Sequence, residues 1–170
     1  GFVVSASYGT DILKENNDRE TYDVAVRYGN NNLGDFAFEA ALGAAWTEET
    51  GETAKRDIVG SVALEHAPTG ISLAVAAGER DISGSYGYAK LGYNTNLISA
   101  GSTSFSVDYY DGSDLDSRGD SASSWGLAAV QKFDNKNVEA YVAYREYSYS
   151  DTTTNYNDSS VIMAGARWKF

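Results

Sequence analysis

The chain has 170 residues, with 24 acidic and 13 basic side chains, and its net charge of −11 disfavours nucleic acid as a partner, because phosphate binding needs a basic face. It contains no cysteine, which excludes a disulfide framework, a thiolate metal site and a cysteine nucleophile. No run of about 18 apolar residues is present, so the sequence predicts no transmembrane helix.

The recurring signal along the chain is alternation of apolar and other residues with period two, which predicts strands with two different faces. In chain order the alternation predicts ten strands, over residues 1–9, 22–28, 36–46, 58–65, 71–78, 86–93, 104–110, 125–133, 138–145 and 162–170. A strand of about nine to eleven residues, tilted by about 45°, crosses the apolar band of a membrane, whereas globular strands average about 5–6 residues. We therefore predict an all-β fold, an antiparallel up-and-down transmembrane β-barrel that occupies residues 1–170 without separate domains.

The connections between the predicted strands alternate between two kinds. Charged loops are expected at 11–19, 48–56, 79–84, 111–123 and 150–158, and short turns at 30–35, 67–70, 94–101 and 134–137. In an up-and-down meander every second connection lies on the same side, so one rim carries all the charged loops. With the flanking Glu20 and Asp57, these loops hold 16 acidic and six basic residues, a net charge of −10.

The last predicted strand ends with alternating aromatic side chains, in the sequence Gly165-Ala166-Arg167-Trp168-Lys169-Phe170. It resembles the terminal strand of Gram-negative outer-membrane β-barrels, and residues 1–9 resemble a strand of the general diffusion porins, particularly the alphaproteobacterial ones. The resemblance implies a multi-pass barrel in the outer membrane, in contact with lipid and lipopolysaccharide. It also implies a homotrimer and recognition of the Phe170 strand by the barrel-insertion machinery.

The prediction departs from the pattern of the general porins in two respects. The resemblance implies a barrel of sixteen strands, whereas ten are predicted here, and it implies a long loop folded into the lumen, whereas no predicted connection is long enough for one. Both departures are explained if the chain supplies the C-terminal ten strands, with the remaining strands of the same barrel as partner. The lumen-facing side is dominated by Ala, Gly and Ser, which suits a wide, water-filled channel better than a narrow barrel packed with side chains. The alternative is a complete ten-stranded barrel with a wet interior.

The charges on the lumen-facing side are the main functional candidates, because such charges set the field that permeating solutes experience. The predicted pore-lining residues are Asp23, Arg27, Glu39, Glu65, Lys90, Asp108, Lys132, Glu139, Arg145, Arg167 and Lys169. If the hairpins close symmetrically, Glu139 faces both Lys132 and Lys169 in a cross-strand charge ladder. We predict a passive channel for small hydrophilic solutes and ions, with a non-channel barrel acting in adhesion or as a structural wall as the alternative.

Large aromatic side chains gather at the ends of the predicted strands. The candidates for two membrane-interface girdles are Tyr8, Tyr22, Tyr28, Phe36, Trp46, Trp125, Phe133, Trp168 and Phe170. A soluble sandwich or ligand-binding β-barrel would bury the same aromatics inward and would tend to place its largest side chains mid-strand. The end placement therefore favours the membrane barrel.

The sequence offers little that could perform bond chemistry. The single histidine, His66, lies at the short-turn end of its strand, and no serine sits in a nucleophile elbow, so no catalytic residue is predicted. Closely spaced carboxylates in one charged loop (Asp111, Asp114, Asp116 and Asp120) suit a hard cation such as Ca²⁺, although their spacing does not match an EF-hand. A solvated acidic loop without a cofactor is the default expectation.

Overall fold

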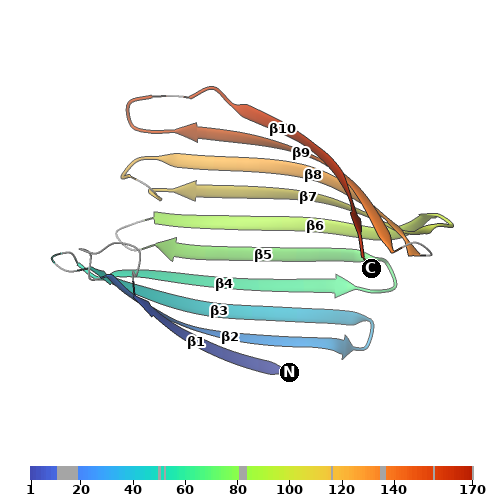
Figure 1. Ribbon diagram of the computed structural model, residues 1–170, viewed down its shortest axis with the longest axis horizontal. Coiled ribbons are helices and arrows are strands. Elements are labelled where there is room, and N and C mark those ends of the chain that lie inside the picture. Colours follow the sequence, from blue (N-terminus) through green and yellow to red (C-terminus); the bar gives the residue numbers. More distant parts are fainter. Residues whose placement is uncertain are drawn as a thin grey trace.

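The structure is a computed structural model, and it describes residues 1–10, 19–49, 51, 53–80, 84–115, 117–134, 137–154 and 156–169. These residues form one sheet of ten antiparallel strands in chain order, so that each strand lies beside its sequence neighbours (Figure 1). The strands are β1 (Phe2–Thr10), β2 (Arg19–Leu33), β3 (Phe36–Glu49), β4 (Lys55–His66), β5 (Ile71–Arg80), β6 (Gly84–Ile98), β7 (Gly101–Ser113), β8 (Ser121–Phe133), β9 (Val138–Ser150) and β10 (Ser159–Trp168). The predicted number, order and direction of the strands are confirmed.

Several strands are longer than the alternation predicts. The predicted turns at 30–35 and 94–101 are mostly strand, because β2 runs to Leu33 and β6 runs to Ile98. In each of these hairpins the strand register shifts close to the turn. The shift lies between Asn30 and Leu33 in the first hairpin and between Thr95 and Ile98 in the second. The sequence prediction was wrong here because a register irregularity interrupts the alternation without ending the strand.

The strand register sorts the side chains onto two faces. The first, which we call the apolar face, carries the row Val26, Leu42, Gly60 and Ala77 and the row Leu73, Leu91, Val107 and Leu127. The second, which we call the polar face, carries the row Arg27, Ala41, Ser61, Ala76 and Tyr88. Every cross-strand pairing keeps the predicted faces together, so the period-two pattern assigned the faces correctly along the chain.

The burial of side chains is inverted relative to a water-soluble protein. Among the described residues no hydrophobic side chain is buried, whereas Thr103, Asp108, Asp120 and Ser124 are. Large apolar side chains stand exposed on the apolar face, including Leu42 at 57 %. Exposed apolar surface of this extent marks an interaction surface rather than a face designed for water.

Among the described residues the sheet ends in two free edges, because β1 pairs there only with β2 and β10 only with β9. The N and C labels of Figure 1 lie at the end of the sheet that carries the short turns, as an up-and-down meander with an even strand number requires. The described residues contain no helix that is long and apolar enough to cross a membrane.

Candidate functional site

The polar face holds all eleven side chains that the sequence predicts to line a pore. Their register positions run across the whole sheet, from Asp23 and Arg27 on β2 to Arg167 on β10, with Lys169 just beyond the strand. Small residues surround them, such as Ala63, Ala74 and Gly126. The structure thus brings the charges to one surface, and their lining of a water-filled lumen stays a prediction.

The most buried charge on the polar face is Asp108 of β7, with 7 % of its surface exposed. Its carboxylate pairs with Arg145 of β9, with 2.5 Å between Oδ1 and Nη2, and Nη1 of Arg145 donates to Ser124 Oγ at 3.0 Å. The two partners lie two strands apart, with Gly126 of β8 between them in register. A Cβ at Gly126 would lie 2.9 Å from Arg145 Nη2 and 3.1 Å from Asp108 Oδ2, so the glycine gives the guanidinium room to cross β8.

A second charge cluster lies at the short-turn end of the polar face. Glu139 accepts hydrogen bonds from the Arg167 guanidinium and from Lys169 Nζ, the latter at 2.9 Å. The register pairs Glu139 with Lys132, as predicted, but with Arg167 rather than Lys169, so the predicted register on β10 is wrong by two residues, whereas the predicted contact of Glu139 with Lys169 is present.

The shift in register originates in the last hairpin. There the Asp151 carboxylate accepts from the amides of Thr153 and Thr154, both at 2.7 Å, and the register places the centre of the turn nearer to β9 than symmetric closure predicts.

The predicted girdle aromatics lie on the apolar face in two groups. Tyr8, Tyr22, Trp46 and Trp125 stand near the charged-loop end, and Tyr28, Phe36, Phe133 and Trp168 near the short-turn end. In the first group the ring of Tyr22 stacks on that of Trp46, with 5.6 Å between ring centroids, and in the second the ring of Tyr28 lies 4.6 Å from that of Phe2, a further aromatic residue on β1. Phe170 lies outside the described residues.

Carboxylates bound to the loop-end aromatics are a feature that sequence reasoning missed. Tyr22 donates to Glu48 at 2.8 Å, Tyr144 donates to Glu146 at 2.8 Å, and Tyr109 lies 3.4 Å from Asp111. Part of the signal was present in the sequence, because an acid follows an aromatic by two residues in Trp46-Thr47-Glu48, Tyr109-Tyr110-Asp111 and Tyr144-Arg145-Glu146. In the first of these the bound aromatic is Tyr22, the register partner of Trp46 on β2. Two residues apart on a strand means the same face.

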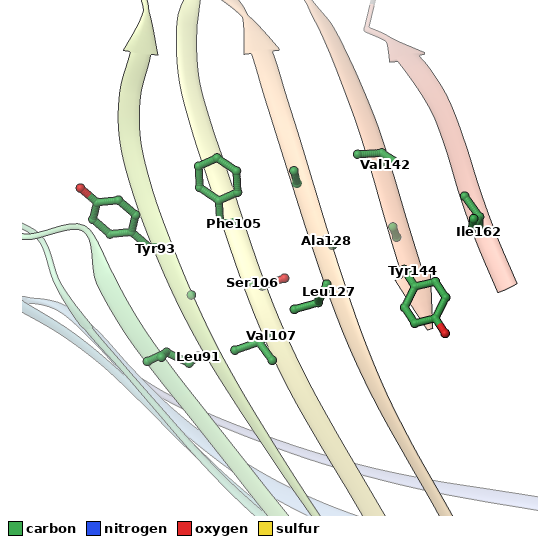
Figure 2. Close-up of a pocket in the computed structure, with 13 residues that line it drawn as sticks. Leu91, Tyr93, Phe105, Ser106, Val107, Leu127, Ala128, Val142, Tyr144 and Ile162 are labelled. Atoms are coloured by element: carbon green, nitrogen blue, oxygen red, sulfur yellow. The ribbon is translucent and has the colours of Figure 1, made fainter. Parts of the chain in front are cut away.

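A broad depression in the described surface lies on the apolar face of β6 to β10, and Figure 2 shows the side chains that line it. Its wall is made almost wholly of apolar side chains such as Leu91, Phe105, Leu127 and Val142. A soluble protein would fill such a surface with a second layer of structure. Here the single sheet leaves it open to whatever surrounds the molecule.

The acidic loop between β7 and β8 uses two of its carboxylates to bind its own backbone. Asp120, which is 4 % exposed, accepts from the amides of Leu115 and Ser117, both at 2.9 Å, and Asp114 accepts from the amide of Gly119. Asp111 is directed to Tyr109, and Asp116 lies outside the described residues. Among the residues that the structure describes, no group of three acidic or histidine side chains is placed to hold a metal ion.

Comparison with known proteins agrees with this geometry. The family model of the Gram-negative porins matches residues 1–152. The chain is also similar in structure to Pseudomonas aeruginosa OccK2 (OpdF), with a TM-score of 0.60 and 11% sequence identity, over 87% of this chain and 50% of that chain. It therefore spans about half the length of that solved structure, and no curated protein matches it. The chain belongs to the Gram-negative porin family, and its ten antiparallel strands are part of an outer-membrane β-barrel.

Proposed function

We propose that the polar face lines a water-filled channel through which small hydrophilic solutes and ions diffuse passively. The observation that supports this most directly is the contrast between the two faces: charged and small side chains share one, and exposed apolar side chains cover the other. In a bilayer the apolar face meets lipid, and the polar face then requires water on its side of the sheet. A soluble barrel would have the opposite arrangement.

The complete barrel, in this proposal, contains further strands of the same protein. The free backbone edges of β1 and β10 support it, because an unpaired N–H or C=O group in a membrane costs several kcal/mol by general estimates, about 2–7 for one amide group. The homotrimer, the contact with lipopolysaccharide and the recognition of the last strand by the insertion machinery remain proposals that rest on family resemblance.

The proposed activity makes and breaks no covalent bond. The single histidine supports this, because His66 is occupied in the turn that follows β4: its Nδ1 lies 2.8 Å from Thr69 Oγ1 and its ring lies 4.7 Å from that of Phe36. A cation at the acidic loop remains a lesser proposal. Three of the four predicted carboxylates are described, and each of them already accepts a hydrogen bond.

The channel proposal is tested by the conductance and ion selectivity of the complete protein in planar bilayers. The charged-loop rim has a net charge of −10, whereas the eleven predicted wall residues carry five acids and six bases. The Debye length is about 30 Å at 0.01 M salt and about 3 Å at 1 M, so a distant rim acts only at low salt. We expect a cation preference at low salt that fades at molar salt.

A matched variant locates the origin of the preference. Replacing Asp111, Asp114, Asp116 and Asp120 together with Asn should reduce the low-salt cation preference and leave the molar-salt conductance unchanged. An absence of conductance would favour the non-channel barrel. An anion preference at low salt would contradict the role of the rim.

A further inference from the structure

One register row on the polar face places opposite charges on either side of two alanines. Glu39 of β3 pairs with Ala63 of β4, Ala63 pairs with Ala74 of β5, and Ala74 pairs with Lys90 of β6. Neighbouring strands lie about 4.8 Å apart, so the Cα atoms of Glu39 and Lys90 are separated by roughly 14 Å. The row therefore presents a carboxylate and an ammonium group across a floor of methyl groups.

The surface is hollowed at this place. A depression lies over Ala63 and Ala74, and its polar lining comes from Asn31, Glu39, Glu65, Ser72 and Lys90. A second depression adjoins it one register row towards the charged loops, between Arg27 and Tyr88, and shares Glu39, Ala63 and Ala74 with the first. We call the first depression the alanine-floored hollow.

The charged side chains of the hollow are not paired with one another. Glu39 leans over Gly29, its partner on β2, where a Cβ would lie 3.6 Å from its Cγ and Oε1 atoms. Asp108, the partner of Lys90 on β7, gives its carboxylate to Arg145. Among the described residues, no ion pair involves Glu39, Glu65 or Lys90. The hollow therefore offers two carboxylates and one ammonium group to a solute.

We propose that the alanine-floored hollow binds small zwitterionic solutes, with the cationic end at Glu39 and Glu65 and the anionic end at Lys90. This inference rests on the proposed function in one respect, because the solute reaches the hollow from a water-filled lumen. A zwitterion satisfies both ends at once, whereas a solute with one charge satisfies only one of them. Exposed ion pairs are individually weak, so we expect dissociation constants roughly in the millimolar range.

The direct test is equilibrium binding to the complete protein in detergent micelles, measured by calorimetry with 5-aminopentanoate as the probe. Pentanoate and pentylammonium, which carry one charge each, should bind about tenfold more weakly. Lys90→Gln and Glu39→Gln should each weaken binding of the zwitterion by about the same factor. Lys132→Gln is the matched control, because it removes the same charge from the same face outside the hollow, and it should leave the affinity for the zwitterion unchanged.

A charge exchange sharpens the test. The double variant Glu39→Lys with Lys90→Glu should recover binding relative to either single exchange, because a zwitterion can bind in the reverse direction. Equal affinity for the zwitterion and the singly charged probes, no binding at all, or equal damage from Lys132→Gln would overturn the proposal. Each variant is first shown to fold by its heat-modifiable migration in gels.

Liposome swelling with glycerol separates this inference from the channel proposal. Glycerol permeation without zwitterion binding overturns the hollow as a site and leaves the channel intact. Zwitterion binding without glycerol permeation supports the site and contradicts the channel.

Discussion

Two adjacent positions on β8 show how different the two faces of the sheet are. Leu127 is 49 % exposed and borders the apolar depression beside Val107 and Tyr144 (Figure 2). Gly126, one residue earlier, is buried beneath the ion pair of Asp108 and Arg145. Water on both faces would favour the opposite arrangement, with the apolar side chain buried and the charged pair exposed. The sheet is built for lipid on one face and for polar surroundings on the other.

The comparison also explains why the molecule needs no hydrophobic core. A single sheet that separates two solvents satisfies the backbone polar groups between its paired strands, and its apolar side chains are stabilised by lipid rather than by a second layer. Membership of the Gram-negative porin family agrees with a sheet that has lipid on one face and polar surroundings on the other.

The largest expected difference between the two faces is in the cost of adding a charge. Leu127→Arg should destabilise the protein in a bilayer by about 2–4 kcal/mol, because it places a guanidinium in the hydrocarbon region. Ala128→Arg, on the polar face between Ser106 and Ala143, should cost far less. Urea unfolding in lipid vesicles measures both. If Ala128→Arg is the more damaging substitution, the faces are reversed.

Removing the buried carboxylate tests the polar face alone. Asp108→Ala leaves Arg145 without its ion-pair partner and should cost about 1–2 kcal/mol. Gly126→Ala should also destabilise, because its Cβ would crowd both partners, but it should cost little in the Asp108→Ala background. A double-mutant cycle on these two positions measures the coupling. Additive effects would mean that Gly126 does not serve the ion pair.

A smaller effect is expected at the loop end of the apolar face. Glu146 accepts from Tyr144 at 2.8 Å, and Trp125 Nε1 lies 3.4 Å from the same carboxylate. Glu146→Gln should destabilise the protein less than Asp108→Ala does, because Glu146 is only half-buried whereas Asp108 is buried. Glu79→Gln, at an exposed carboxylate on this face near the charged loops, is the control. An equal effect at both positions would assign the loss to charge alone and not to the aromatic partners.

The smallest effect concerns the last loop, which lies outside the strands. The amide of Thr153, then its hydroxyl and the amide of Thr154, hold the pKa of Asp151 below its ordinary value. Its contribution to the loop is therefore present above the ordinary pKa and is lost as the pH falls through the lowered pKa. Thr153→Ala removes the hydroxyl and should raise the pKa of Asp151 part of the way, as followed by carboxyl NMR. An unchanged pKa would leave the amides as the whole cause.

Much of this fold could be predicted from the sequence because the alternation carries the information directly. The faces of Leu42, Leu73 and Leu127 follow from period two alone, and so does the sharing of one face by the eleven wall charges. The pairs across strands could not be predicted in the same way. Arg145 reaches Asp108 only because β8 places a glycine between them, and the contact of Glu139 with Arg167 depends on a turn whose centre the alternation does not mark.

Paired cysteine accessibility along β8 tests the account most directly, because residues 1–170 contain no cysteine that would react beside the introduced one. Leu127→Cys and Ala128→Cys are introduced separately into the complete protein in lipid vesicles and treated with a charged, water-soluble maleimide. The account predicts rapid modification at 128 and strong protection at 127. For a fluorescent probe attached to each cysteine, it predicts the reverse order of quenching by a spin label dissolved in the lipid. Equal and rapid modification at both positions, or protection at 128 with modification at 127, would contradict it.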